Sequence, residues 1–99
     1  MLKDALKDLE DVFPKIVKLM PDEFNSHDFI LALARKYQKL YVQALFANKE
    51  ENLPFNRTHM AIGKRLKRHK DLVKQIDYKP SPNIFGQENK VAVWQKVKK

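Results

Sequence analysis

The chain has 99 residues, the length of one domain, and a hydrophobic content of 43%, which supplies one core and argues against disorder. The absence of cysteine excludes disulfides and thiolate metal sites. The net charge of +8 lies entirely in the second half: residues 1–52 carry 8 Lys+Arg against 9 Asp+Glu, and residues 53–99 carry 12 against 3. A polyanionic partner would account for this separation, and a solvated basic face without a partner is the alternative.

No segment resembles a secretory signal or an apolar run of membrane-spanning length. We therefore expect a cytoplasmic protein without a membrane partner.

The first expected element is an amphipathic helix over residues 1–20. Apolar side chains recur there at the spacing of one helix face: Leu2, Ala5, Leu6, Leu9, Val12, Phe13, Ile16, Val17 and Met20. Pro14 predicts a kink or a break near Phe13, because proline lacks an amide hydrogen and clashes with the preceding turn. We expect this face to complete the core; the alternative is a surface that pairs two copies into a homodimer.

A second helix is expected to begin at Ser26, whose hydroxyl can accept hydrogen bonds from the free amides of the first turn. Residues 29–46 are apolar over a broad surface, which indicates the central and most buried helix. Residues 48–54 form the polar loop that follows it.

The third helix is expected over residues 57–76, with Asn56 or Thr58 as its cap. One side of its helical wheel gathers the side chains expected to pack: Thr58, Ile62, Leu66, His69, Val73 and Ile76. The opposite side is cationic and comprises Arg57, Lys64, Lys67, Arg68 and Lys74, whereas Arg65 and Lys70 flank the packed side. Gly63 lies between the two sides at a cost of about 1 kcal/mol relative to alanine, which we interpret as room for close helix packing.

A small β-hairpin is expected over residues 77–97. Residues 91–94 are rich in β-branched and aromatic side chains and predict a short strand, paired with residues 78–79 across a turn at Gly86. Two short strands are not stable alone, so the hairpin is expected to dock through Trp94, Phe85 and Ile84. The expected fold is a single domain, mainly α with a small β-hairpin (α+β): three helices, with residues 24–76 as the helical core, followed by two strands.

No arrangement of residues in the sequence predicts catalysis. His27, His59 and His69 lack the spacing of metal ligands on one helix, and two isolated glycines cannot form a phosphate-binding loop. No serine lies in a recognisable nucleophile turn. The sequence therefore predicts a binding protein, with no enzyme activity, no metal site and no cofactor.

The cationic side of the third helix is the candidate binding surface, because Lys and Arg on a rigid helix can follow phosphates and release their counterions. Arg57 could read a guanine edge and Asn56 an adenine edge, while the lysines would position the helix on phosphates. Lys90, near the tip of the hairpin, would add a second contact. The candidate nucleic-acid-binding residues are Asn56, Arg57, Lys64, Lys67, Arg68, Lys74 and Lys90.

Two segments resemble parts of winged helix-turn-helix domains. Residues 58–66 contain the Thr-x-x-x-Ile-Gly-x-x-Leu pattern of such proteins, and residues 83–94 are similar to their wing. The resemblance covers about residues 24–97 and implies a winged-helix fold with the hairpin as its wing. It also implies binding of double-stranded DNA, as in transcription regulators. The family includes protein-binding members, so a module that binds an acidic protein partner is an alternative, and RNA binding is a third.

Overall fold

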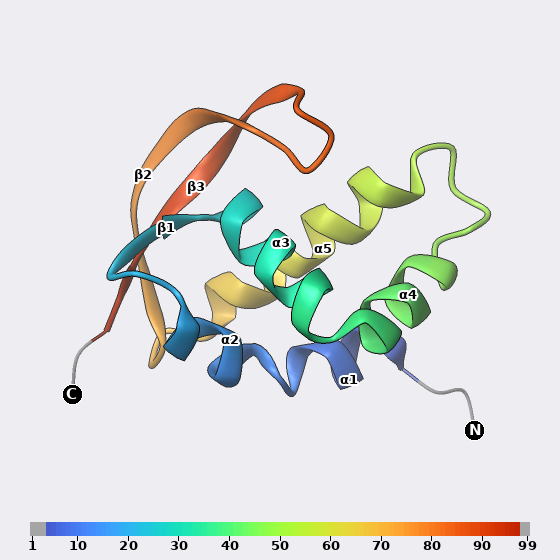
Figure 1. Cartoon of the computed structure of the whole chain (residues 1–99), viewed down its shortest axis with the longest axis horizontal. Helices are drawn as coiled ribbons and strands as arrows, with labels where there is room; N and C mark the ends of the chain where they lie inside the picture. The colour runs from blue at the N-terminus through green and yellow to red at the C-terminus, as the bar shows by residue number, and fades with distance from the viewer. Residues whose placement is uncertain (1–3, 98–99) are drawn as a thin grey trace.

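The computed structural model describes residues 4–97, which form both helices and strands. The sheet lies along one side of the molecule and most of the helices lie along the other (Figure 1). This arrangement confirms the α+β class. In chain order the elements are α1 (Ala5–Glu10), α2 (Phe13–Leu19), β1 (Glu23–Asn25), α3 (Ser26–Lys36), α4 (Gln38–Phe46), α5 (Pro54–Arg68), β2 (Val73–Pro82) and β3 (Glu88–Lys96).

The sheet has three antiparallel strands in the order β1-β3-β2, so the expectation of two strands is wrong. The additional strand, β1, is only three residues long and pairs Phe24 with Trp94. So short a segment has no alternation of apolar and polar residues that a sequence pattern could detect. The predicted pairing of residues 78–79 with the strand over residues 91–94 is confirmed, since Tyr78 faces Ala92 and Lys79 faces Val91.

The predicted first helix is divided into α1 and α2, as Pro14 indicated. The proline lies at the start of α2, where its missing amide hydrogen costs nothing. Leu9, Phe13 and Ile16 are each 0% exposed, so this apolar face contributes to the core, as expected. Leu2, which belongs to the predicted stripe, lies outside the described residues.

The predicted central helix is also divided, into α3 and α4, with Tyr37 in a non-helical conformation between them. The two helices run in different directions (Figure 1), so only part of the broad apolar surface reaches the core. Val42 and Phe46 of α4 stay 57% and 63% exposed, so the expectation of one helix buried throughout is wrong for α4.

The cap of α3 is Asn25, whose Oδ1 accepts from the Asp28 amide at 2.8 Å. Ser26, the expected cap, is instead buried and accepts a hydrogen bond from the Trp94 indole N–H at 2.9 Å.

Helix α5 is shorter than the expected helix over residues 57–76, and it begins earlier. Neither Asn56 nor Thr58 caps it, because the helix starts at Pro54, whose fixed φ suits a first turn. It ends at Arg68, and β2 begins at Val73. The β-branched side chain of Val73 fits a strand, and it is buried there at 3% exposure.

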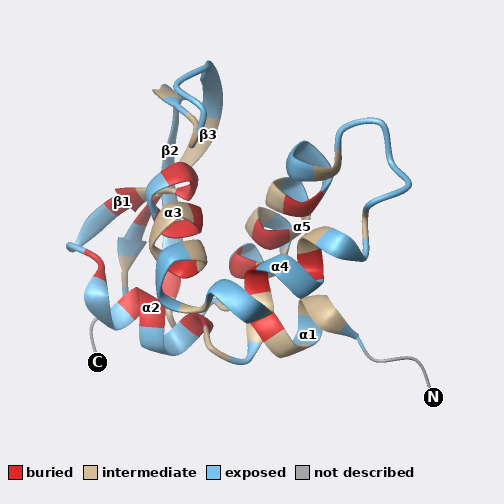
Figure 2. Ribbon diagram, turned by 45° about the vertical axis from the view of Figure 1, so that its right-hand side comes forward, coloured by how far each residue is buried: buried red, intermediate tan, exposed pale blue. Residues whose placement is uncertain are grey.

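The core lies between the helices and the inner side of the sheet (Figure 2). Phe13 and Phe29 meet edge to face at 5.1 Å, and Trp94 anchors β3 at 2% exposure. Ile84 packs partly against the core, as expected. Phe85 does not, because it is 55% exposed; its ring contacts Phe55 of α5 at 5.0 Å instead. The outer half of the hairpin therefore stands above the helices (Figure 2).

No helix within residues 4–97 combines the length and the apolar character that crossing a membrane requires.

Candidate nucleic-acid interface

The orientation of α5 is fixed by one buried side. Thr58, Ile62 and Leu66 are each 0% exposed, which confirms the part of the predicted packed side that lies within α5. The expectation that Ile76 packs on the same helix side is wrong, because it lies on β2 and is 39% exposed. The Thr58 hydroxyl accepts a hydrogen bond from the Asn48 side-chain amide at 2.9 Å. Because a helix that buries one side must present the other, the opposite side of α5 faces solvent.

The predicted site residues are all exposed, but they come from three elements rather than from one helix and a hairpin tip. Lys74 is the second residue of β2, so its placement on the helix was wrong; the helix ends six residues earlier, at Arg68. Lys90 lies on β3 opposite Pro80, near the end of the hairpin. The others are on α5: Asn56, Arg57, Lys64, Lys67 and Arg68.

Two arginines of α5 already have acidic partners. The Arg57 Nε lies 3.6 Å from Glu51 Oε1, in a pair whose side chains are 62% and 48% exposed. The Arg65 Nη1 lies 2.8 Å from Glu10 Oε1, and these side chains are only 24% and 13% exposed. Arg65 is therefore part of a mostly buried ion pair that stabilises the fold, as its position on the flank of the wheel indicated.

Glu10 of α1 joins the end of α5 to the first helix. Its second oxygen, Oε2, lies 2.7 Å from His69 Nε2, and the His69 ring packs on Phe13 with centroids 5.7 Å apart. Burial acts to raise the pKa of the Glu10 carboxyl, but the hydrogen bonds and charges of Arg65 and His69 outweigh it, and the pKa is lowered. His69 therefore packs on the predicted side of the wheel and is hydrogen-bonded there.

The remaining cations of α5 form the basic face, which we define as Lys64, Lys67 and Arg68. Within residues 4–97, none of these three side chains makes an ion pair, and the same holds for Lys74 and Lys90. Exposed cations that lack internal partners need no rearrangement before they meet an external anion. The basic face is thus the part of α5 with the least competition from the chain's own acids.

The hairpin is held close to the start of α5 by the contact between Phe85 and Phe55. Its turn is well defined, because the Gly86 amide donates to the Asn83 carbonyl at 2.9 Å and Gly86 has a φ of +79°. That φ favours glycine. The Asn83 side chain accepts from the amides of Phe85 and Gln87 at 2.9 and 3.0 Å, which further restrains the turn.

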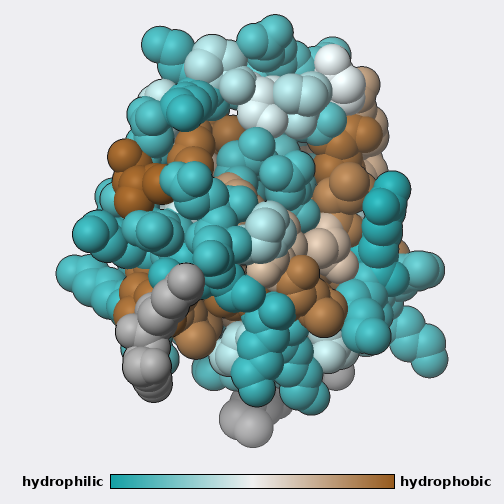
Figure 3. Space-filling model, turned by 60° about the vertical axis from the view of Figure 1, so that its left-hand side comes forward, coloured by the Kyte–Doolittle hydropathy of each residue, from teal (hydrophilic) through white to brown (hydrophobic). Residues whose placement is uncertain are grey.

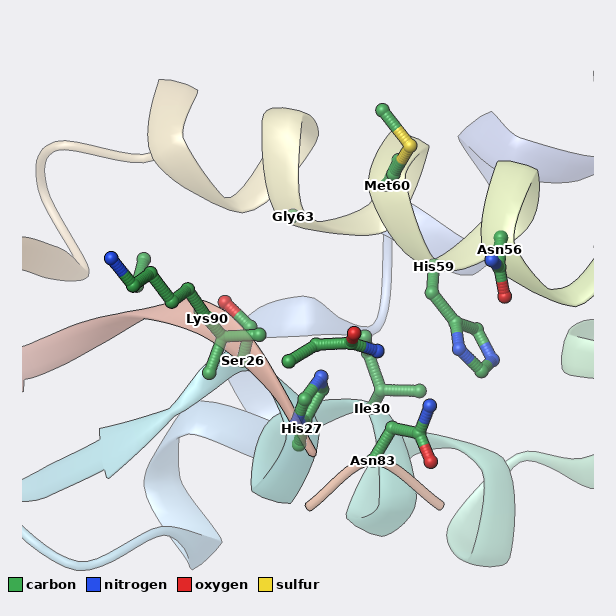
Figure 4. Close-up of a pocket in the computed structure, with 12 residues that line it drawn as sticks. Ser26, His27, Ile30, Asn56, His59, Met60, Gly63, Asn83 and Lys90 are labelled. Atoms are coloured by element: carbon green, nitrogen blue, oxygen red, sulfur yellow. The ribbon is translucent and has the colours of Figure 1, made fainter. Parts of the chain in front are cut away.

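A cleft separates α5 from the hairpin and from the start of α3 (Figure 4). Its volume is about 330 Å³. The sequence interpretation missed this cleft, and residues far apart in the chain form it: Ser26, His27, Ile30, Asn56, His59, Met60, Gly63, Asn83, Asn89, Lys90, Val91 and Ala92. Within residues 4–97, no cluster of three His, Cys, Asp or Glu side chains is arranged to hold a metal ion.

His59 and Gly63 are two of the four α5 residues that line this cleft. The His59 Nε2 lies 2.7 Å from the Tyr41 hydroxyl, and burial, with His27 nearby, lowers the pKa of His59 to about 4. A Cβ at Gly63 would meet nothing within 4 Å, so the interpretation of Gly63 as a site of close helix packing was wrong. The unexplained mid-helix glycine was the one sequence signal that could have pointed to the cleft.

Hydrophilic side chains cover most of the face seen in Figure 3, and hydrophobic ones lie between them in separate areas.

Comparison of the chain with models of protein families, with curated proteins and with solved structures finds no match to any of them.

Proposed function

We propose that this protein binds double-stranded DNA, with the basic face of α5 against one groove and Lys90 of the hairpin against the phosphate backbone. The observation that carries the proposal is the basic face itself, three exposed cations within two turns of an oriented helix. An α-helix fits the major groove, and cations along it can neutralise phosphates on the groove walls.

The order of elements also supports the proposal. In this chain α5 is followed directly by the β2–β3 hairpin, and β1 adds a third strand beside β3. A helix followed by a projecting hairpin corresponds to the recognition helix and wing of a winged-helix module, the architecture that the sequence resembles. The hairpin stands above the helices (Figure 2), so Lys90 and the basic face could contact the same duplex.

The test is a fluorescence-anisotropy titration with a duplex of about 20 base pairs at about 50 mM and about 200 mM salt. We expect clear binding at the lower salt and a steep loss at the higher salt. The combined variant Lys64→Gln, Lys67→Gln, Arg68→Gln should bind at least about tenfold more weakly, and its salt dependence should be shallower by about three ion equivalents, since each phosphate contact contributes about one.

A matched control removes the same charge from elsewhere. Lys15, Lys18 and Lys39 are exposed on α2 and α4, and their combined change to glutamine lowers the net charge equally. This control should bind within about twofold of the unmodified protein, because it leaves the basic face intact. Absence of binding at low salt, or an equal loss in both triple variants, would refute the proposal. Single-stranded RNA should compete only weakly; stronger competition than by duplex DNA would favour an RNA target.

A protein-binding module is the second candidate, and exposed apolar side chains on α4 favour it. Val42 and Phe46 are 57% and 63% exposed and lie one turn apart. Exposed aromatic residues commonly anchor protein interfaces. The variant Val42→Ser, Phe46→Ser should leave DNA affinity unchanged if the basic face is the functional surface. Loss of DNA binding in that folded variant would mean that α4 contributes to the interface.

A further inference from the structure

The cleft between α5, the start of α3 and the hairpin has the dimensions of a small-molecule site. Its volume of about 330 Å³ lies within the range of ligand pockets, about 300–1,000 Å³. Ile30, Val91 and Ala92 give it an apolar floor and side, while asparagine and histidine side chains supply hydrogen-bonding groups. This combination of apolar surface with a few polar groups is typical of sites that bind organic molecules.

His27 provides the first specific sign of a ligand. The side chain is buried, at 9% exposure, and its Nδ1 has no hydrogen-bond partner within the described part of the chain. Buried polar atoms in proteins are nearly always paired, because leaving one unpaired is unfavourable. Figure 4 shows His27 rising from the start of α3 into the cleft below α5. The Nδ1 atom itself is closed to solvent in this conformation, so a modest turn of the ring would bring it to a ligand in the cleft, which would then make the hydrogen bond that the protein does not.

Gly63 provides a second, independent sign. Glycine in the middle of a helix is less favourable than alanine, so it is normally explained by a positive φ or by close packing. Gly63 has neither a positive φ nor any atom within 4 Å of the position that a Cβ would occupy. The side chain that is missing from Gly63 leaves space in the cleft, on the side of α5 that faces Lys90 and the hairpin (Figure 4).

The charges around the cleft indicate the charge of the ligand that it would bind. None of the residues lining it is acidic, and Lys90 adds a cation at its edge. The His59 ring is neutral at physiological pH, since its pKa of about 4 lies well below that range. The cleft therefore offers a cation and neutral hydrogen-bonding groups over an apolar floor, which suits an organic anion better than a cation.

We propose that this cleft binds a small aromatic carboxylate. The ring would occupy the space beside Gly63, above Ile30, with its polar edge toward His27 and its carboxylate toward Lys90. This proposal does not rest on DNA binding: none of Lys64, Lys67 and Arg68 lines the cleft, and Lys90 is the residue that the two proposed surfaces share.

The test is an NMR titration of the 15N-labelled protein with two probes, nicotinate and indole-2-carboxylate. At least one of them should shift the amide signals of His27, Gly63 and Ala92 saturably, with a dissociation constant in the millimolar range or below. Nicotinamide, which has the same ring as nicotinate without its charge, should bind about fivefold more weakly, the size expected for a partly exposed ion pair. Inorganic phosphate should leave the Gly63 and Ala92 signals unchanged.

Variants at two positions localise the effect. Gly63→Leu should fill the cleft and weaken binding of the probe at least tenfold, whereas Gly63→Ala, the matched control, should retain most of the affinity. Lys90→Gln should reduce the affinity for the carboxylate to that for nicotinamide, and it tests the proposal even if Gly63→Leu does not fold. The proposal is overturned if neither carboxylate binds, if the shifts map to Lys64, Lys67 and Arg68, or if folded Gly63→Leu binds as well as the unmodified protein.

Discussion

The two arginine ion pairs of α5 look equivalent in a count of charges and differ in their surroundings. At the start of the helix, Arg57 and Glu51 are mostly in water and 3.6 Å apart. Near its end, Arg65 and Glu10 are mostly buried and 2.8 Å apart, and His69 shares the same carboxylate. Water screens the first pair and leaves it easily exchanged, while the second pair joins α5 to α1. The comparison separates an arginine that is available to a ligand from one that orients the helix.

The largest expected effect is on stability, from Glu10→Gln. Loss of the carboxylate would leave the partly buried Arg65 guanidinium without its counter-charge, and we expect a loss of about 1–3 kcal/mol after allowing for its residual exposure. Glu51→Gln, which makes the same chemical change at the exposed pair, should alter stability by less than about 0.5 kcal/mol. Urea unfolding followed by circular dichroism measures both. Equal effects of the two variants would show that burial does not distinguish the pairs.

The next expected effect is a loss of stability in mild acid. It arises from His59 of α5, whose partly buried ring is hydrogen-bonded to the Tyr41 hydroxyl of α4. Burial lowers the pKa of His59 from 6.5 to about 4, so the unfolded chain takes up a proton at a higher pH than the folded chain does. The stabilising contribution of His59 is therefore complete above about pH 6.5 and is lost as the pH falls toward 4.

Between pH 7 and pH 5 this loss should be about 1–2 kcal/mol, after discounting for partial exposure of the ring. Urea unfolding at the two pH values measures it. His59→Gln, which retains a hydrogen-bonding group near Tyr41, should show a correspondingly smaller difference between the two pH values. An unchanged difference in that variant would assign the acid sensitivity to another group. Glu10 acts at lower pH, since a carboxyl with a lowered pKa loses its contribution only as the pH falls through that value.

The sequence predicted those features of α5 that depend on spacing alone. The helical period placed Thr58, Ile62 and Leu66 on the buried side, because three- and four-residue steps return to one face of any helix. The exposure of Lys64, Lys67 and Arg68 follows from the same geometry. The end of the helix did not follow, because Val73 and Ile76 continue the helical period as well as they fit a strand.

Features that depend on distant residues could not be predicted. Glu10 lies 55 residues from Arg65 in the chain, so no local pattern connects them. The strand β1 exists because Phe24 can pair with Trp94, which follows the last helix, α5, in sequence. The cleft is made by three elements that meet only in the folded chain, and His27 and Asn83 carry no signal of it in their own neighbourhoods.

A smaller and opposite effect on stability is expected from Gly63→Ala. The added Cβ would enter open space, and alanine restricts the unfolded chain and favours the helix more than glycine does. We expect a gain of about 0.5–1 kcal/mol in urea unfolding. A loss of stability would indicate that the cleft is closed in solution and that the backbone at Gly63 is in contact with its neighbours.

The smallest expected effect returns to the exposed pair and concerns DNA affinity. In the proposed complex a phosphate competes with Glu51 for Arg57, so Glu51→Gln should free the arginine and remove a repulsive charge. We expect about two- to threefold tighter binding at low salt, which corresponds to about 0.4–0.7 kcal/mol. Arg57→Gln should weaken binding by a similar factor and reduce the salt dependence by about one ion equivalent. Anisotropy titrations of both variants test this reading. If Glu51→Gln binds tighter while Arg57→Gln has no effect, the carboxylate acts through its charge alone and Arg57 does not contact the duplex.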